Sequence, residues 1–337
     1  MSNDENNLLE IDELKVHFAA GKRHLLAQPT KVHAVDGVSL NIRRGSSFGL
    51  VGESGSGKTT TALAVMRLAP ITAGDIRLNG QEIGQLQGES LREARRQMQI
   101  IFQDPYSSLN PRVRAGAIVR SPLDQLEVGD ESHRAARVEE LFKLVGLRPE
   151  QQALFPHQFS GGQRQRIGVA RALATQPELI VCDEPVSALD VAIQAQILNL
   201  LRRLQDDFGL TYLFISHDLG VVQYMCDEIA VMYLGQIVER ADRMSLFRDP
   251  LHPYTWALLS AVPTADRSVK SKIERIRLAG DPPSPINPPP GCRFASRCPF
   301  AVSQCAAETP PLRAVNGDHM IACHLVSDDG VPPQRRN

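Results

Sequence analysis

The sequence predicts an α/β fold: a mostly parallel sheet covered by helices on both faces, an inserted helical subdomain and a small loop-rich C-terminal extension. Through the first 245 residues, short apolar runs alternate with helix-period segments, which is typical of parallel strands connected by helices. A central stretch carries helix-period segments and little strand signal. The last 88 residues hold 14 of the 23 prolines, and proline interrupts helices and central strands.

Three strands and two helices support this reading in order along the chain. Ser47–Val51 is a short apolar run, and a helix is expected over 60–68. Further strands are expected at 179–182 and 211–215, where β-branched and aromatic residues are frequent. The helix between them carries one apolar face and should stop at a glycine; these residues are Ile197, Leu200, Leu201, Leu204, Phe208 and Gly209.

The stretch from about 104 to 164 is expected to be a helical subdomain inserted into the α/β core. It has helix periodicity, for example over 138–145. The interval between Lys58 and Asp183 is also longer than one βαβ unit needs. We therefore expect an α/β core domain over 8–245, with the helical subdomain inserted, and an extension over 246–330.

Composition limits the functional classes. The 337 residues suffice for two domains. With 37 basic against 38 acidic side chains, the net charge of −1 gives no indication of nucleic-acid binding. No apolar run reaches 18 residues, so no membrane span is expected. The acidic N-terminus lacks an apolar signal core, which predicts an intracellular protein.

A phosphate-binding loop follows the first of these strands. The motif G-x-x-x-x-G-K-[ST] places backbone N–H groups around a phosphate at the positive end of a helix. Its lysine would reach the β- and γ-phosphates, and Thr59 would bind Mg²⁺. The expected nucleotide-binding residues are Gly52, Ser54, Gly55, Ser56, Gly57, Lys58, Thr59 and Thr60.

Two acidic residues end the strand at 179–182. Asp183 would hold the Mg²⁺, usually through water, and Glu184 would polarise the attacking water. Adjacent acids after a strand are often only solvated loop charges. Here an apolar strand precedes them and a phosphate loop lies upstream, so we expect both acids to be functional.

With these motifs, Phe159-Ser160-Gly161-Gly162-Gln163 resembles the LSGGQ signature of ATP-binding-cassette (ABC) ATPases, with Phe159 in place of leucine. Gln103 resembles the Q-loop glutamine, which would also contact the Mg²⁺. Ser187-Ala188-Leu189-Asp190 resembles the D-loop, His217 the switch histidine, and Phe18 the aromatic residue that stacks on adenine. The resemblance implies that Glu184 and His217 are catalytic.

The same resemblance implies a dimeric mechanism. Ser160 and the Gly161–Gly162 backbone would form a second phosphate clamp, with Gln163 beside it, and would cap the ATP bound by a partner ATPase. Hydrolysis of the ATP would then separate the two ATPase subunits. The surface around Gln103 is where this family docks membrane subunits, so the chain is expected at the cytoplasmic face of the inner membrane as a peripheral protein.

The C-terminal part resembles one subgroup of importers. His252-Pro253-Tyr254-Thr255 and the proline-rich run to Cys292 are similar to the extension of oligopeptide and dipeptide importer ATPases, and Asp104 to Pro111 is typical of them. The chain looks most like the second of the two ATPases, the F-type subunit. A sister ATPase, two permease subunits and an extracytoplasmic solute-binding protein are the implied partners.

Four cysteines lie in this extension, at Cys292, Cys298, Cys305 and Cys323. Their spacing fits neither a C-x2-C zinc ribbon nor a bacterial ferredoxin run, and it leaves free thiols and a metal site equally open. The resemblance suggests a [4Fe–4S] cluster, with zinc as the alternative. Cys182 and Cys226 lie in apolar contexts and are expected in the core.

The function implied is ATP hydrolysis that energises peptide import. Alternatives are an importer ATPase for glutathione, a metal chelate or a sugar, and a soluble ABC ATPase acting on ribosomes or DNA. The last class usually has two cassettes or a long coiled coil, and this chain has one cassette and no sustained heptads. An exporter ATPase would not be expected to carry this extension.

Overall fold

The structure is a computed structural model that describes residues 6–20, 30–261, 278, 280–315 and 317–333. The chain divides into two compact units, and each is made of three segments. The first unit comprises Met1–Glu10, Asn41–Ser47 and Arg77–Ile215, and the second unit comprises Ile11–Leu40, Phe48–Ile76 and Ser216–Asn337. Strands β1 (Asn7–Ala20), β2 (Thr30–Arg43) and β4 (Ala73–Leu78) belong in part to each unit.

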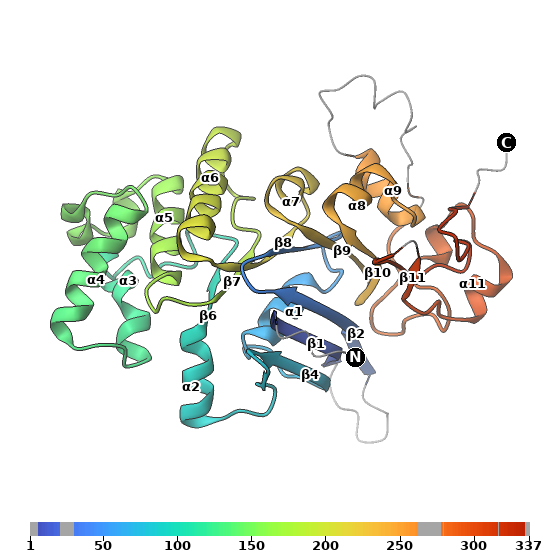
Figure 1. The fold of residues 1–337 in the computed structure, drawn as a ribbon, viewed down its shortest axis with the longest axis horizontal. Coiled ribbons are helices and arrows are strands. Elements are labelled where there is room, and N and C mark those ends of the chain that lie inside the picture. The colour runs from blue at the N-terminus through green and yellow to red at the C-terminus, as the bar shows by residue number, and fades with distance from the viewer. Residues whose placement is uncertain (1–5, 21–29, 262–277, 279, 316, 334–337) are drawn as a thin grey trace. The chain divides into compact units, whose positions relative to one another are not determined.

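The α-helices of the first unit have 10 to 18 residues, whereas the α-helices described in the second unit have 5 to 8 (Figure 1). In chain order its remaining elements are β5 (Gln81–Glu82), α2 (Gly88–Gln97), β6 (Met98–Ile101), α3 (Ala115–Gln125), α4 (Glu131–Leu144), η1 (Pro149–Ala153), η2 (Pro156–Gln158), α5 (Gly161–Ala172), β7 (Leu179–Asp183), α6 (Val191–Phe208) and β8 (Thr211–Ser216).

Strand β7 lies between β6 and β8, and both pairings are parallel. Every residue of β7 and β8 is buried, as expected for parallel strands covered on both faces. The strands predicted at 179–182 and 211–215 are therefore confirmed. So is helix α6, which ends at Gly209 in the left-handed conformation, with φ 64°.

One residue of the predicted apolar face of α6 is not buried. Ile197, Leu200, Leu201 and Leu204 are almost fully buried, whereas Phe208 is 50% exposed. Phe208 occupies the last position of α6, where the chain turns away at Gly209. Its ring lines a shallow pocket with Leu210, so the terminal residue of the helix is only partly covered.

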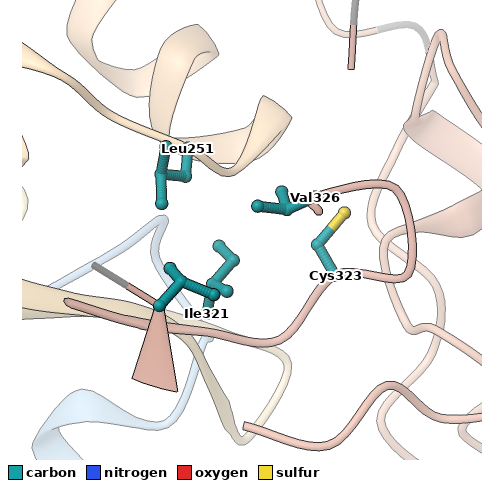
Figure 2. Packing of buried hydrophobic residues seen from close by; sticks show 5 residues of the cluster. Leu251, Ile321, Cys323 and Val326 are labelled. Carbon is teal, nitrogen blue, oxygen red and sulfur yellow. The ribbon is translucent and has the colours of Figure 1, made fainter. Parts of the chain in front are cut away.

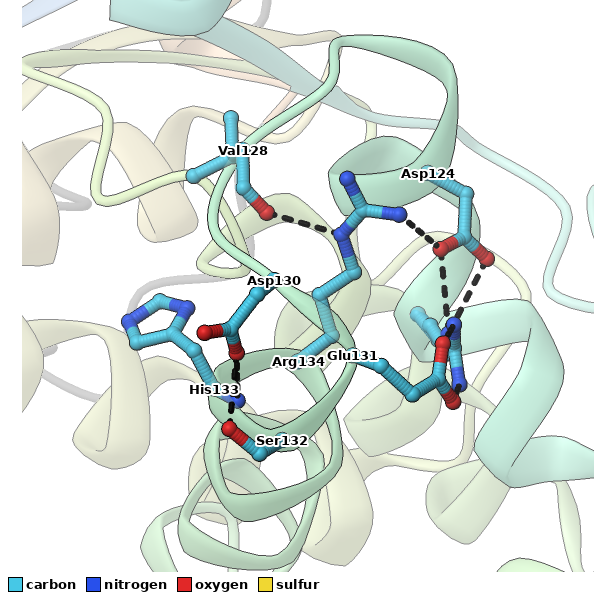
Figure 3. Close-up of polar contacts among 8 residues, drawn as sticks. Asp124, Val128, Asp130, Glu131, Ser132, His133 and Arg134 are labelled. Carbon is cyan, nitrogen blue, oxygen red and sulfur yellow. Dashed lines mark hydrogen bonds and ion pairs between the residues drawn. The ribbon is translucent and has the colours of Figure 1, made fainter.

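A polar network joins the helices α3 and α4 (Figure 3). Arg120 pairs with Asp124 and Glu131, and Arg134 pairs with Asp124 and donates to the carbonyl of Val128. The hydrogen bond from Arg120 lowers the pKa of Glu131. These contacts fix the turn between the two helices, and α3 packs in addition against α5.

The second unit contains the phosphate-loop strand and the C-terminal extension. Besides its share of β1, β2 and β4, its elements are β3 (Ser47–Val51), α1 (Lys58–Val65), α7 (Leu219–Met225), β9 (Glu228–Tyr233), β10 (Gln236–Asp242), α8 (Arg243–Arg248), α9 (Pro253–Ser260), η3 (Ala295–Arg297), α11 (Ser303–Ala307), β11 (Arg313–Val315) and β12 (His319–Ile321).

The strands of the second unit lie in the order β11-β12-β10-β9-β3. Strand β3 is parallel to β9, and the pairs that follow are antiparallel. The proline-rich extension thus adds two short strands to the edge of this sheet. A small apolar cluster lies beneath them (Figure 2), made by Leu251, Val315, Ile321, Cys323 and Val326.

The strand predicted at Ser47–Val51 is confirmed as β3. The helix expected over 60–68 is α1 (Lys58–Val65), which begins two residues earlier and ends three residues earlier than expected. Cys182 and Cys226 are fully buried, as expected for core residues. No helix within the described residues combines the length and the apolar character that a membrane crossing needs.

Candidate nucleotide-binding site

The phosphate loop connects β3 to α1 in the second unit. Gly57 precedes the helix with φ 108°, and a Cβ there would lie 2.2 Å from the carbonyl oxygen of Ala34. Only glycine fits this combination of positive φ and close backbone approach. The loop therefore has the strand–loop–helix placement that the motif requires.

The side chains of this loop suit a phosphate ligand. Lys58 is buried, and its Nζ donates to the carbonyl oxygens of Gly52 and Glu53 at 2.9 Å each. The hydroxyl of Ser56 is buried and has no hydrogen-bond partner among the described residues. Ser54 and Thr59 are exposed at the same loop. A buried hydroxyl without a partner is costly, and a phosphate oxygen would supply one.

Gln103 and Glu184 lie together in the first unit. The Nε2 of Gln103 donates to Oε2 of Glu184 at 2.7 Å. Asp183 is buried at the end of β7. Glu184 has φ 47°, and its N–H donates to the carbonyl oxygen of Ile215 at 2.9 Å. A positive φ is strained for a residue with a side chain, and such strain is concentrated at functional sites.

The signature segment begins helix α5 in the first unit. Ser160 is the N-cap residue: its hydroxyl accepts from the N–H of Gln163, and its own N–H donates to Oε1 of Gln163 at 3.0 Å. This is a capping box. The S-x-x-Q spacing is the sequence signal for it, and it assigns Gln163 a local role that the family resemblance alone did not indicate.

Phe18 and His217 belong to the second unit. Phe18 is 38% exposed near the end of β1, so its ring is accessible. His217 is exposed and directly precedes Asp218, whose side chain caps helix α7. The predicted site residues are thus divided between the units: the phosphate loop, Phe18 and His217 belong to the second, and the remainder belong to the first.

The four cysteines of the extension lie near one another. Burial raises the pKa of the Cys298 thiol to about 11, and the thiols of Cys323, Cys292 and Cys305 add to the rise. Backbone N–H groups point at three of the sulfurs: those of Phe294 and Ala295 at Cys292, that of Phe300 at Cys298, and those of Leu325 and Val326 at Cys323.

Among the described residues, one set of three metal-ligating side chains has its ligand atoms within 4.8 Å of one another, and it is His17, His33 and Asp36 rather than the cysteines. Both histidines bond the Asp36 carboxylate, at 2.9 and 3.3 Å, and Arg293 pairs with it as well. Because the arginine neutralises the carboxylate, a cation is not favoured there.

Sequence reasoning missed the residues that hold the phosphate loop from outside. Glu53 bonds Arg297 and Tyr254, both from the C-terminal extension. The partners are more than 200 residues apart in sequence, so no local sequence pattern predicts these contacts. The weak signal available was an ionisable residue inside the loop motif and two arginines between Cys292 and Cys298.

Comparison with known proteins places these observations in a family. Residues 35–187 match the ABC transporter family, and residues 238–305 match the oligopeptide/dipeptide transporter C-terminal region. The oligopeptide transport ATP-binding protein AppF of Bacillus subtilis (strain 168) is 47% identical over 96% of this chain and 99% of its own length. YkfD of the same strain is 49% identical over 94% and 95%.

The fold agrees with solved cassettes. The dimeric structure of the bacterial ABC transporter cassette MJ0796 has a TM-score of 0.61 and 28% identity, covering 70% of this chain and 98% of that one. A dimeric post-hydrolysis state of the same cassette, bound to ADP and phosphate, matches equally well. From its motifs, its fold and these relatives, the chain belongs to the ATP-binding proteins of the ABC transporter family that carry the oligopeptide/dipeptide transporter C-terminal region.

Proposed function

We propose that this chain is the ATP-hydrolysing subunit of a peptide importer. It would work with a sister ATPase, two permease subunits and an extracytoplasmic solute-binding protein, as a peripheral protein at the cytoplasmic face of the membrane. The observation that carries the proposal is the oligopeptide/dipeptide transporter region at 238–305 on the same chain as a complete phosphate loop. The name of AppF supports the solute class.

In this proposal the phosphate loop binds the β- and γ-phosphates of ATP. The backbone N–H groups from Gly55 to Thr60 surround the phosphates, and Lys58 exchanges its bonds to two loop carbonyls for phosphate oxygens. Phe18 stacks on the adenine. Thr59, Gln103 and Asp183 hold the Mg²⁺, which neutralises charge that develops on the phosphates.

In this proposal Glu184 and His217 carry out the hydrolysis of ATP. A water molecule attacks the γ-phosphorus, Glu184 accepts a proton from it, and the bond to the bridging oxygen of ADP breaks. His217 contacts the γ-phosphate. The hydrogen bond between Gln103 and Glu184 supports a link between the base and the segment that leads to the helical subdomain.

The signature segment acts on the partner's nucleotide. Ser160, Gly161 and Gly162 lie at the N-terminus of α5, and the capping box with Gln163 keeps the serine oriented there. The dimeric MJ0796 cassettes support a two-subunit arrangement of this kind. Two ATP molecules would then hold the two ATPases together. Hydrolysis of the ATP would let the two ATPases separate.

The surroundings of the four cysteines support a metal centre. Backbone N–H groups directed at sulfur are typical of metal thiolates, because they stabilise the negative charge. A single zinc ion at Zn–S bonds of about 2.3 Å would hold its sulfurs about 3.8 Å apart, and no three of these cysteines lie within 4.8 Å of one another. The sulfurs are thus not gathered as a single zinc ion requires, and we infer the iron–sulfur cluster that the family resemblance implies, which would staple the extension.

Metal analysis of the chain tests this assignment. Anaerobic purification should give iron and acid-labile sulfide with an absorption band near 400 nm, and Cys305→Ser should lose most of both. Cys226→Ser, which changes a buried cysteine outside the group, should keep them. Stoichiometric zinc, or a metal content unaffected by Cys305→Ser, would contradict the cluster.

Uptake by the assembled transporter tests the function. The chain, its sister ATPase and the permease subunits are reconstituted in proteoliposomes with the binding protein and labelled peptide. Peptide uptake should depend on ATP, and Lys58→Ala should abolish it because the phosphates lose their cationic partner. The exposed Lys143→Ala should behave as wild type. Uptake of glutathione, a metal chelate or a sugar but no peptide would overturn the solute class.

A further inference from the structure

The loop between Cys292 and Cys298 places an arginine on the phosphate loop. Arg297 holds both carboxylate oxygens of Glu53, with NH1 at 2.8 Å from Oε2 and NH2 at 3.2 Å from Oε1. Its side chain is 8% exposed, and that of Glu53 is 31% exposed. A bidentate arginine–carboxylate pair fixes orientation as well as charge, so the extension holds the second residue of the phosphate-loop motif.

Aromatic residues of the second unit complete the contact. The Tyr254 hydroxyl accepts the backbone N–H of Glu53 at 2.8 Å, and burial raises the pKa of Tyr254, which keeps it neutral. Tyr254 packs against Tyr233 and Phe294, with ring centroids 4.7 and 5.4 Å away. Both the carboxylate and the backbone of Glu53 are therefore held by residues outside the loop.

The charges make this contact relevant to ATP. Glu53 is an anion inside a loop that must receive a polyphosphate, so without a neutralising partner it would repel the ligand. Arg297 is the cation paired with it. The Nε of Arg297 is buried without a hydrogen-bond partner among the described residues. An ion pair that is partly exposed at Glu53 and leaves a buried arginine donor unsatisfied contributes little to stability, which points to a role in the charge of the site.

We propose that Arg297 is a positioning residue of the nucleotide site: by neutralising and orienting Glu53, it lets the C-terminal extension set the affinity for ATP. The proposal rests on ATP binding at the phosphate loop. It does not depend on the transported solute.

Nucleotide titrations of the purified full-length chain test it. With Mg²⁺ and a non-hydrolysable ATP analogue, Arg297→Ala should weaken binding by about threefold to tenfold, as expected for one uncompensated charge near the phosphates. Glu53→Gln should bind at least as tightly as wild type, because it removes an anion from the loop while the positive charge of Arg297 remains. The double variant should bind within about twofold of wild type, since its local charge is again neutral.

Controls separate charge from loss of structure. Arg297→Lys keeps the charge and should retain most of the affinity. Arg248→Ala, which removes an exposed arginine of the second unit, should have no effect. Adenosine, which has no phosphate, should bind all variants equally, and the effect of Arg297→Ala should shrink as salt is added. Circular dichroism of each variant confirms that it is folded.

Three results would overturn the proposal: wild-type affinity in Arg297→Ala, failure of Glu53→Gln to restore that variant, or equal weakening of adenosine and ATP. The last two would show that the pair merely supports the fold. If Arg297→Ala does not fold, the affinities of Arg297→Lys and Glu53→Gln still decide, since weaker binding in Glu53→Gln contradicts the charge argument. Absence of ATP binding in the wild-type chain would instead contradict the nucleotide site itself.

Discussion

Glu184 combines a strained backbone with a side chain that accepts a hydrogen bond from Gln103. Its φ of 47° is unusual for a residue with a side chain, and Gln103 donates to its carboxylate. Strain of this kind persists only where surrounding structure fixes it, and here the Glu184 N–H is bonded to Ile215. The local structure therefore holds the carboxylate in place before any nucleotide binds.

Glu184→Gln should separate binding from hydrolysis. The amide keeps the size of the side chain but cannot accept the proton of the attacking water, so the rate of ATP hydrolysis should fall by a factor of about 10² to 10⁴. Affinity for ATP should change little. Phosphate release and analogue binding by the assembled ATPase pair measure the two quantities. Glu139→Gln on the exposed face of α4 is the matched control, and equal hydrolysis by all three proteins would contradict the base assignment.

At the scale of elements, the start of helix α9 depends on a buried histidine. His252 is the N-cap residue, and its Nδ1 accepts the N–H of Tyr254 at 3.0 Å. Burial lowers the pKa of His252 to about 4, against the opposing effect of Glu239. The Glu239 carboxylate also accepts the N–H groups of Leu251 and His252 and pairs with His319. Through these contacts, Glu239 holds the beginning of the extension in place.

The pH dependence of stability follows from this depressed pKa. Between about 6.5 and about 4, unfolded His252 takes up a proton that the folded protein does not bind, so the free energy of unfolding decreases as the pH is lowered. The loss should reach at most about 3 kcal/mol. Denaturant unfolding at several pH values measures it.

His252→Asn should reduce that pH dependence, because asparagine can cap the helix without titrating. His157→Asn, which changes an exposed histidine, should leave the dependence as it is. An identical pH profile for wild type and His252→Asn would contradict the role of His252.

The elements that the sequence predicts well are those with strong local patterns. The strands β3, β7 and β8 and the helix α6 were predictable from apolar runs and from Gly209. The strands β11 and β12 were not, because each has only three residues: β12 forms by pairing with the distant strand β10, and β11 pairs with β12. The exposure of Phe208 likewise depends on how the chain leaves α6.

At the scale of the whole molecule, the candidate nucleotide-site residues could be predicted from sequence motifs. The contact by which the extension is proposed to act on the site could not. Lys58, Asp183 and Glu184 could be identified from the residues before and after them. The Arg297–Glu53 pair joins residues 244 positions apart, and only the fold of the second unit brings them together. In our proposal, a proline-rich segment that reads as a loop-rich tail thus becomes part of the nucleotide site.

The central claim is that ATP hydrolysis by this chain energises peptide import. It is tested most directly by measuring the ATPase rate of the complete transporter in proteoliposomes, with and without peptide-loaded binding protein. The account predicts that peptide raises the rate several-fold and that Glu184→Gln abolishes the increase. A rate that is insensitive to peptide, or a peptide-stimulated rate that survives Glu184→Gln, would contradict it.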